Sequence, residues 1–364
     1  MGPRSLKIPI LNDLHLGIKS ENKALFANQK KFFNKVFFPY CVEHDVDNVI
    51  IAGDVFDDRN SIGLLTMDFA SWLIRKFQSL SITVHMIPGN HDVKYRDTNA
   101  VNSLEPMFSR HEGFHVYMNP VDLTFDHATI SLVPWINKSN EEETLDFIAN
   151  SLSDVIITHA EYDGMRMPSG HILKGLDPSL FEKFTYTLNG HIHSRSTHKS
   201  VVNLGLQYQL TWGNLNSPIG FRVLDCSETD IVLETIDNPH RVFWHIEADE
   251  NQKVNREAFA EWVFNNSSKL KGALLRVSNF GPTDDVFKDF VRALNQCELS
   301  DLKIEHLAFD ATQVDDDPIN EDVRTIDALS LIKEEIDMKI DNDMEKVLLN
   351  KALASLSVAM EEGN

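Results

Sequence analysis

Short apolar runs rich in β-branched residues recur along the amino-terminal half of the chain, each bounded by Gly, Pro or Asn. Runs of this length and composition predict buried β-strands. Five of them end in side chains that bind metals: LKIPILNDLHLG, VDNVIIAGDVFDD, ITVHMIPGNHD, SDVIITHAEY and YTLNGHIH. Because ligands of open α/β sheets bind outside the carboxyl ends of the strands, this pattern predicts that all five clusters meet at one rim.

Helical patterns lie between these strands. They predict helices at Asn22–Phe38, Gly63–Ser79, Val101–Arg110 and Glu141–Leu152. The first should end at Phe38, because a proline disfavours the helical conformation in the residue before it. Further strands are expected near Phe114–Tyr117, Ala128–Val133, Val201–Leu204, Phe221–Asp225 and Ile231–Thr235. The alternation of strands and helices predicts an α/β domain over residues 1–240.

A smaller α/β unit is expected over residues 241–310. Its strands are Val242–Ile246, Ala273–Val277 and Leu302–Leu307, and its helices are Arg256–Asn265 and Asp284–Leu294. Residues 311–324, rich in Asp, Pro and Asn, are expected to form an acidic linker. Residues 325–364 predict two amphipathic helices that break at Asp341–Asp343. These helices either pack on their own domain as an ordinary hairpin or present a face to a partner, and the pattern favours neither.

The composition is that of a soluble globular protein with about two domains, since 42% of its 364 residues are hydrophobic and 24% are charged. No apolar run is long enough to cross a membrane, and the opening residues read as a first strand. The three cysteines lie far apart without a CxxC pair, which favours a reducing cytoplasm. A net charge of −21 is unusual for a chain that grips nucleic acid alone.

The side chains at the strand ends are suited to divalent metals. Asp13 and His15 are separated by one residue, as are His191 and His193, so each pair shares one face of a strand. A single pair of this kind is weak evidence, but its repetition at the end of separate strands is not. Carboxylate, carboxamide and imidazole ligands without thiolate favour manganese, iron or zinc.

Taken together, DLH, GDVFDD, GNHD, the histidine of THAE and GHIH resemble the calcineurin-type metallophosphoesterases in motif and in order. The finer pattern resembles SbcD-type nuclease subunits of double-strand-break repair complexes, especially their phage counterparts. DLHLG, GDVFDDRNSI, LVPWI and VVNLGLQYQLTWGNLNSPIGFRVLD carry this closer likeness. The protein phosphatase branch has Arg directly after the aspartate that Asp57 matches, whereas this chain has Asp58, which argues against a Ser/Thr phosphatase.

The resemblance implies a sandwich of mixed sheets flanked by helices, with a small α/β capping domain and a carboxyl-terminal helical pair. It also implies two divalent metal ions, and the family points to manganese. One ion would be held by Asp13, His15, Asp54 and His193, and the other by Asp54, Asn90, His159 and His191. Asp54 would bridge the two ions, His91 would act as general acid, and the Asp57 carboxylate would orient His91. Asp57 could otherwise be a turn or helix-cap residue.

The partners implied by the resemblance are DNA and a coiled-coil SbcC-type ATPase. This chain lacks the GxxxxGK[ST] phosphate loop, so any dependence on ATP would come from another subunit. The compartment would be the cytoplasm, that of the host if a phage encodes the chain. A homodimer is expected through Asn22–Phe38 and Val101–Arg110. At least half of the phenylalanines in the first segment (Phe26, Phe32, Phe33 and Phe37) are nevertheless expected to be core residues.

Two other functions remain open at this stage. An enzyme of the same fold could hydrolyse a small cyclic nucleotide or phosphomonoester, but that leaves the capping unit and the helical tail without a purpose. A scaffolding subunit could retain the metal site only to assemble a complex. His171, in the loop before GHIH, is either a surface histidine or within reach of the site.

Overall fold

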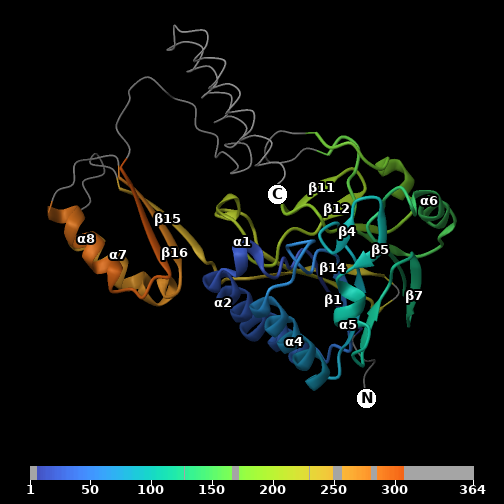
Figure 1. Cartoon of the computed structure of the whole chain (residues 1–364), viewed down its shortest axis with the longest axis horizontal. Coiled ribbons are helices and arrows are strands. Elements are labelled where there is room, and N and C mark those ends of the chain that lie inside the picture. The colour runs from blue at the N-terminus through green and yellow to red at the C-terminus, as the bar shows by residue number, and fades with distance from the viewer. Residues whose placement is uncertain are drawn as a thin grey trace, which may run out of the picture. The chain divides into compact units, whose positions relative to one another are not determined.

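The computed structural model describes residues 6–126, 128–165, 172–228, 230–248, 256–279 and 285–306 (Figure 1). The expected linker at 311–324, the expected helices at 325–364 and His171 lie outside the described residues. The expected domain boundaries stay a prediction. Among the helices that the structure describes, none has the length and apolar character needed to span a membrane.

The first sheet holds three of the five predicted strand ends. Its strands, in spatial order, are β14 (Val232–Asp237), β13 (Gly220–Asp225), β1 (Lys7–Leu11), β2 (Asn48–Ala52), β3 (Thr83–Ile87) and β6 (Phe114–Val116). Strands β1, β2 and β3 are parallel, with Ile10 opposite Ile50 and Ile50 opposite His85. Their carboxyl ends therefore lie at the same edge.

The second sheet holds the other two strand ends. Its order is β11 (Ser196–His198), β12 (Val201–Asn203), β10 (Tyr186–Asn189), β9 (Val155–Thr158), β8 (Ala128–Val133) and β7 (Val121–Phe125). Ile8, Ile10 and Ile50 of the first sheet pack against Ile130 and Ile157 of the second in one buried cluster. The predicted sandwich of mixed sheets is confirmed.

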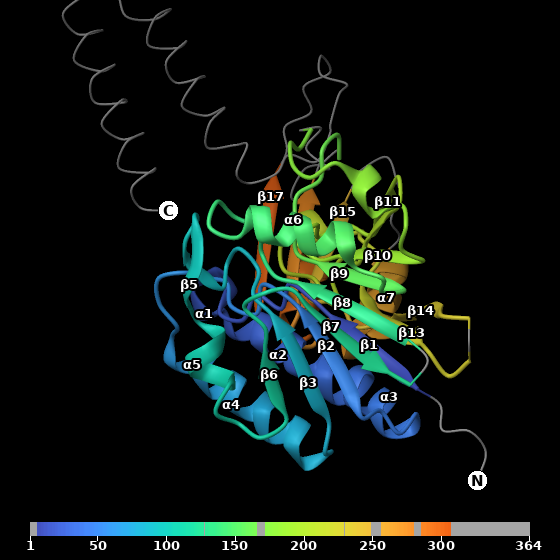
Figure 2. The same cartoon turned by 90° about the vertical axis from the view of Figure 1, so that its right-hand side faces the viewer.

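Helices cover the outer faces of the sandwich (Figure 2). Those on the first sheet are α1 (Ile18–Glu21), α2 (Lys23–Phe32), a π-helix (Phe33–Phe37), α3 (Phe38–Glu43), α4 (Leu64–Ser79) and α5 (Leu104–Phe108). Those on the second are α6 (Glu141–Asn150) and a 3-10 turn at Pro178–Phe181. Phe32, Phe33 and Phe37 are fully buried in the layer beneath the first sheet, so the core interpretation of these phenylalanines is confirmed.

The first long helix does not end at Phe38, so that prediction is wrong. The chain passes from α2 through the π-helix directly into α3, which contains Pro39. Pro39 lies in the first turn of α3, where a backbone N–H has no helical acceptor and its loss costs little. The π-helix thus allows a proline in a helix that continues to Glu43.

The predicted helix Val101–Arg110 is too long at its start. Val101 belongs to a strand, β5 (Thr98–Asn102), which pairs with β4 (Val93–Tyr95) in a hairpin that follows GNHD. Only Leu104–Phe108 is helical, as α5. The apolar spacing that suggested one helix comes from two elements.

A third, all-parallel sheet follows in the chain, in the order β15 (Phe243–Ala248), β16 (Leu274–Asn279) and β17 (Asp301–His306). The crossovers are α7 (Arg256–Leu270) and α8 (Asp285–Asn295), drawn beside the sheet in Figure 1. Leu275 and Val277 of the central strand share a buried cluster with Val263 of α7 and Phe290 of α8. The strands and helices expected in this segment are present.

Candidate metal centre

The predicted ligands lie in the loops that leave five parallel strands. Asp13 and His15 follow β1, Asp54 follows β2, and Asn90 follows β3, all from the first sheet. From the second sheet, His159 follows β9, and His191 and His193 follow β10. The two sheets together assemble the seven side chains into two groups.

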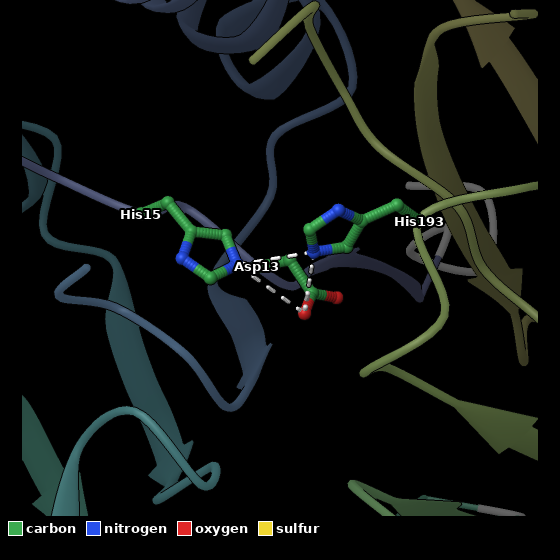
Figure 3. A group of neighbouring side chains, drawn as sticks. All are labelled: Asp13, His15 and His193. Atoms are coloured by element: carbon green, nitrogen blue, oxygen red, sulfur yellow. Dashed lines mark hydrogen bonds and ion pairs between the residues drawn. The ribbon is translucent and has the colours of Figure 1, made fainter. Parts of the chain in front are cut away.

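The first group consists of Asp13, His15 and His193, whose ligand atoms lie within 4.8 Å of one another. Figure 3 shows the imidazoles of His15 and His193 converging on the Asp13 carboxylate, with their Nε2 atoms 3.1 Å apart. Asp13 Oδ1 lies 3.9 Å from His15 Nε2 and 3.8 Å from His193 Nε2. This oxygen is buried without a hydrogen-bond partner, as expected of an oxygen that would bind a cation.

The second group consists of Asp54, His159 and His191, joined by Asn90. The Asn90 side-chain oxygen lies 2.9 Å from His191 Nδ1 and 3.1 Å from His159 Nε2. His159 Nε2 is also 3.3 Å from Asp54 Oδ2. Two imidazoles, a carboxylate and an amide oxygen form a donor set that fits a divalent transition metal.

Asp54 connects the two groups. Its Oδ2 lies 3.3 Å from His159 Nε2 in the second group and 3.9 Å from His15 Nε2 in the first. Its Oδ1 accepts a hydrogen bond from the His91 backbone N–H at 2.7 Å. One oxygen is therefore fixed by the backbone while the other lies between both sets of ligands, which is the position of a bridging carboxylate.

Two glycines allow the loops to approach so closely. A side chain at Gly53 would collide with the His159 imidazole, and one at Gly89 would collide with Asp54. Gly53 also has a φ of +86°. The ligands themselves carry strain, since Asp13, His15, Asp54 and His191 have positive φ values between 43° and 64°. Non-glycine residues adopt this conformation rarely and mostly where surrounding structure or function requires it.

The site is strongly polarised even without metal. Burial disfavours charge on His15, but Asp57, Asp54 and Asp13 outweigh it and raise the pKa of His15 to about 9. For His159, Asp54 and Asp13 similarly outweigh burial and raise the pKa to about 9. Burial opposes ionisation of Asp54, yet these histidines lower its pKa. In the metal-free protein, protons on the histidines compensate the carboxylates that a cation would otherwise neutralise.

Asp57 has a different contact from the one expected. His91 Nδ1 lies 2.7 Å from the backbone oxygen of Asp57, so the carbonyl orients the imidazole. The Asp57 carboxylate lies instead 3.0 Å from His15 Nδ1. The sequence places Asp57 near both histidines, but the direction of the loop decides which of its oxygens meets which ring.

Asp92, the last residue of GNHD, has no role in the sequence prediction. It is buried, and its carboxylate accepts hydrogen bonds from the backbone N–H groups of Gly89, Val55 and Phe56 at 2.9–3.1 Å. Burial and the charge of Asp54 raise the pKa of Asp92 to about 7. Asp92 ties the loop after β2 to the loop after β3, and its place in the motif was the available signal.

Three basic side chains, Arg59, Lys94 and Arg96, come from the loop after β2 and from the β4–β5 hairpin. Burial and the neighbouring Arg96 lower the pKa of Arg59, while the charge of Asp54 acts in the opposite direction. Lys94 donates a 2.6 Å hydrogen bond to Asn60, the residue after Arg59. Arg59 thus lies close enough to Arg96 and Asp54 to be influenced by both charges, and Lys94 contacts the loop that carries Arg59.

Comparison with known proteins decides the family. The sequence model of the calcineurin-like phosphoesterases matches residues 6–195, more than half of the chain, and this range contains every proposed ligand. The chain belongs to the calcineurin-like phosphoesterase family. The family and fold that the five clusters predicted are thereby confirmed, as is a role for divalent metal.

Three named relatives show which members of the family the chain resembles. The chain is 30% identical over 240 residues to exonuclease subunit 1 of Enterobacteria phage T4, covering 66% of this chain and 69% of that protein. It is 25% identical over 320 residues to the SbcD component of the SbcCD nuclease of Staphylococcus epidermidis, covering 76% and 83%. It is 23% identical over 259 residues to the DNA double-strand break repair protein Mre11 of Nanoarchaeum equitans, covering 62% and 68%.

All three of these relatives are named as nuclease subunits or as a break-repair protein. The predicted resemblance to SbcD-type nuclease subunits is therefore confirmed, and with it the enzyme class, a metal-dependent nuclease.

Proposed function

We propose that this chain is the nuclease subunit of a DNA-end-processing complex, which hydrolyses phosphodiester bonds at a centre of two divalent ions, manganese by preference. The observation that carries the proposal is Asp54 Oδ2, which lies between the two ligand groups. Such a pair of ions, when bound, activates a water and neutralises the charge that develops on the phosphoryl group. The relatives named as nuclease subunits point to DNA as the substrate.

The ligand roles proposed are those expected from the family. Asp13, His15 and His193 hold one ion, Asn90, His159 and His191 hold the other, and Asp54 contacts both. The unpartnered oxygen of Asp13 and the converging nitrogens of His15 and His193 support the first assignment. The contacts of Asn90 with both histidines of the second group support the second.

His91 is proposed as the general acid. Its Nδ1–H is held by the Asp57 carbonyl, which leaves Nε2 as the nitrogen that can hold and release a proton. The ring lies 5.0 Å from that of His15, centroid to centroid, so it borders the first ligand group without belonging to the proposed ligands. Protonation of the leaving oxygen by Nε2 completes the hydrolysis.

The basic residues Arg59, Lys94 and Arg96 are proposed to contact the DNA backbone beside His91. Cationic side chains attract phosphates, and this cluster partly offsets the net charge of −21 locally. The remainder of the DNA grip is assigned to a coiled-coil ATPase subunit of the SbcC type. That subunit would also supply any dependence on ATP, since the chain has no phosphate loop of its own. The three cysteines are free and buried, as befits a reducing host cytoplasm.

A homodimer is also proposed. Phe32, Phe33 and Phe37 are buried within the protomer, so they do not supply its interface. Exposed apolar side chains at the start of α4, Leu64 and Leu65, and Val101 on β5 are better placed for this role. Sedimentation of the Leu64→Glu/Leu65→Glu double variant should give a lighter species than the wild type if this surface is the interface.

The deciding experiment is digestion of end-labelled linear DNA by the purified chain with manganese, magnesium or a chelator. Manganese-dependent shortening is expected, and His91→Ala should reduce it about 10²–10⁴-fold while both metal ions remain bound. Intact DNA together with cleavage of a small phosphodiester would favour a small-substrate enzyme, unless addition of the ATPase subunit restores digestion. Loss of metal from His91→Ala would contradict the general-acid assignment.

The partner-binding segment is tested separately. Deletion of residues 325–364 should leave phosphodiesterase activity intact but weaken co-purification with the ATPase subunit. An insoluble or unfolded product would show instead that these residues pack on their own domain.

A further inference from the structure

Each histidine ligand has one ring nitrogen facing the metal centre and a second facing outward. His159 presents Nε2 to the centre, and its outward Nδ1 lies 2.9 Å from the Ala52 carbonyl oxygen. His15 also presents Nε2, and its outward Nδ1 lies 3.0 Å from the Asp57 carboxylate. An oxygen acceptor at the outward nitrogen fixes the proton there and leaves the inward lone pair for a metal.

His191 has the opposite orientation. Its Nδ1 faces the centre, 2.9 Å from the Asn90 side-chain oxygen, so its outward nitrogen is Nε2. The Glu161 carboxylate lies 3.4 Å from this Nε2. Glu161 follows the ligand His159 by two residues, so the loop that supplies one ligand of the second group also supplies a carboxylate to the other.

The surroundings of His191 make this contact consequential. Its backbone has a φ of +64°, and the Trp135 ring lies 5.6 Å from its imidazole. Neither feature selects the protonation state of the ring. Without an outward acceptor, a neutral imidazole can place its proton on Nδ1, which would block the nitrogen that faces Asn90.

We infer that Glu161 is a positioning residue of the second ligand group, which holds the proton of His191 on Nε2 and so presents Nδ1 to the metal. The inference rests on the metal centre of the proposed function and adds a residue outside its ligand set. Glu161 reaches the nitrogen that faces away from the centre, so it acts through His191. Its effect is confined to one ion, because the first group has its own carboxylate at Asp57.

The test is a manganese titration of the full-length chain, with free manganese measured by its electron paramagnetic resonance signal. The wild type should bind two ions. Glu161→Ala should bind one ion with unchanged affinity and the other about 10–100-fold more weakly. Glu161→Gln should bind close to the wild type, because the amide oxygen can still accept the Nε2 proton. Asp163→Ala, an exposed carboxylate two residues further along the same loop, is the matched control and should not change binding.

A purely structural role would lower the Tm equally with and without manganese. Under the inference, the rise in Tm on adding manganese, measured from each variant's own metal-free Tm, should be smaller in Glu161→Ala than in the wild type. Two ions bound with wild-type affinity by Glu161→Ala, an equal loss in Glu161→Gln, or an undiminished rise in Tm would each overturn the inference.

The binding isotherm separates this inference from the proposed nuclease function. A wild type that binds two ions but cuts no DNA would count against the function alone. The comparison of the Glu161 variants would still test the inference. A wild type that cuts DNA while Glu161→Ala binds both ions normally would overturn the inference alone. A wild type that binds fewer than two ions would overturn both.

Discussion

The loops of the metal centre leave strands of both sheets, whereas the phenylalanine layer lies on the helices that cover the first sheet, and the two regions meet different physical demands. The layer, formed by Phe32, Phe33, Phe37, Phe38 and Phe77, has ring centroids 5.2–6.1 Å apart and few polar atoms. The centre buries Asp13, His15, Asp54 and His159 at 3% exposure or less, and several of these have strained backbones. Apolar packing depends on volume, whereas a metal site depends on the direction of each lone pair.

This contrast teaches that stability and chemistry are separable in this protein. Substitutions in the phenylalanine layer should lower the free energy of unfolding without a selective effect on metal affinity. Substitutions at the centre should lower metal affinity selectively, because they remove a ligand or the group that orients one. Three substitutions test this separation, and a fourth, at His85, lies outside both regions.

Asp54→Ala should have the largest effect. Because one carboxylate oxygen serves both ligand groups, the variant should bind neither ion tightly and should lose all measurable cleavage. Manganese titration and DNA digestion provide the readouts, and the far-ultraviolet circular dichroism of the metal-free variant should match the wild type. Retention of one tightly bound ion would show that Asp54 does not bridge the groups.

Phe37→Ala should have the largest effect on stability. Phe37 is fully buried and contacts Phe33, Phe38 and Phe221 with centroids 5.2–5.7 Å apart. Loss of the ring from a packed core costs about 3–5 kcal/mol, measurable by urea denaturation. Manganese affinity of the folded fraction should be unchanged. Phe264→Ala, at a ring that is 80% exposed, is the control and should change stability by less than about 0.5 kcal/mol.

Asp57→Ala should have a smaller effect, which is confined to the metal affinity of the centre. Because the Asp57 carboxylate faces His15, its loss should weaken the binding of one ion by about 10–100-fold. The carbonyl that holds His91 is unaffected by the substitution, so kcat at saturating manganese should change little. A large fall in kcat with unchanged metal affinity would instead support the original expectation that this carboxylate orients His91.

His85→Gln should have the smallest effect, at a residue outside both the metal centre and the phenylalanine layer. It is buried, and its Nδ1 and Nε2 lie 2.9 Å from Tyr117 Oη and 3.2 Å from Asn48 Oδ1. Burial and the neighbouring His115 lower the pKa of His85 to about 4. Below pH 6.5 the unfolded chain takes up a proton that the folded protein does not, so stability falls as pH drops from 6.5 towards 4.

The expected loss from His85 is roughly 1 kcal/mol between pH 7.5 and 5.5. His85→Gln should remove that part of the pH dependence in urea denaturation, whereas His111→Gln, at an exposed histidine, should not. Parallel pH profiles for His85→Gln and the wild type would show that His85 takes up a proton equally readily in the folded and unfolded protein.

Much of this arrangement was predictable from local sequence. A β-branched run specifies a strand wherever it folds, and a ligand at the end of a parallel strand reaches the edge of the sheet regardless of the remaining contacts. For this reason the strands β1, β2, β3, β9 and β10 were placed correctly. The same reasoning failed at Pro39 and Val101, where a π-helix and a hairpin altered the local backbone without a clear signal in the apolar pattern.

By itself, the sequence determined the family, the sandwich of sheets and the set of side chains that reach the rim. Only the tertiary structure decided which oxygen faces which ring nitrogen. It directed the Asp57 carboxylate to His15 and its carbonyl to His91, buried Asp92 between two loops, and brought Glu161 to His191. These pairings depend on the directions of loops that leave neighbouring strands of the same sheet. Strand periodicity does not encode those directions, because packing contacts far apart in the chain set them.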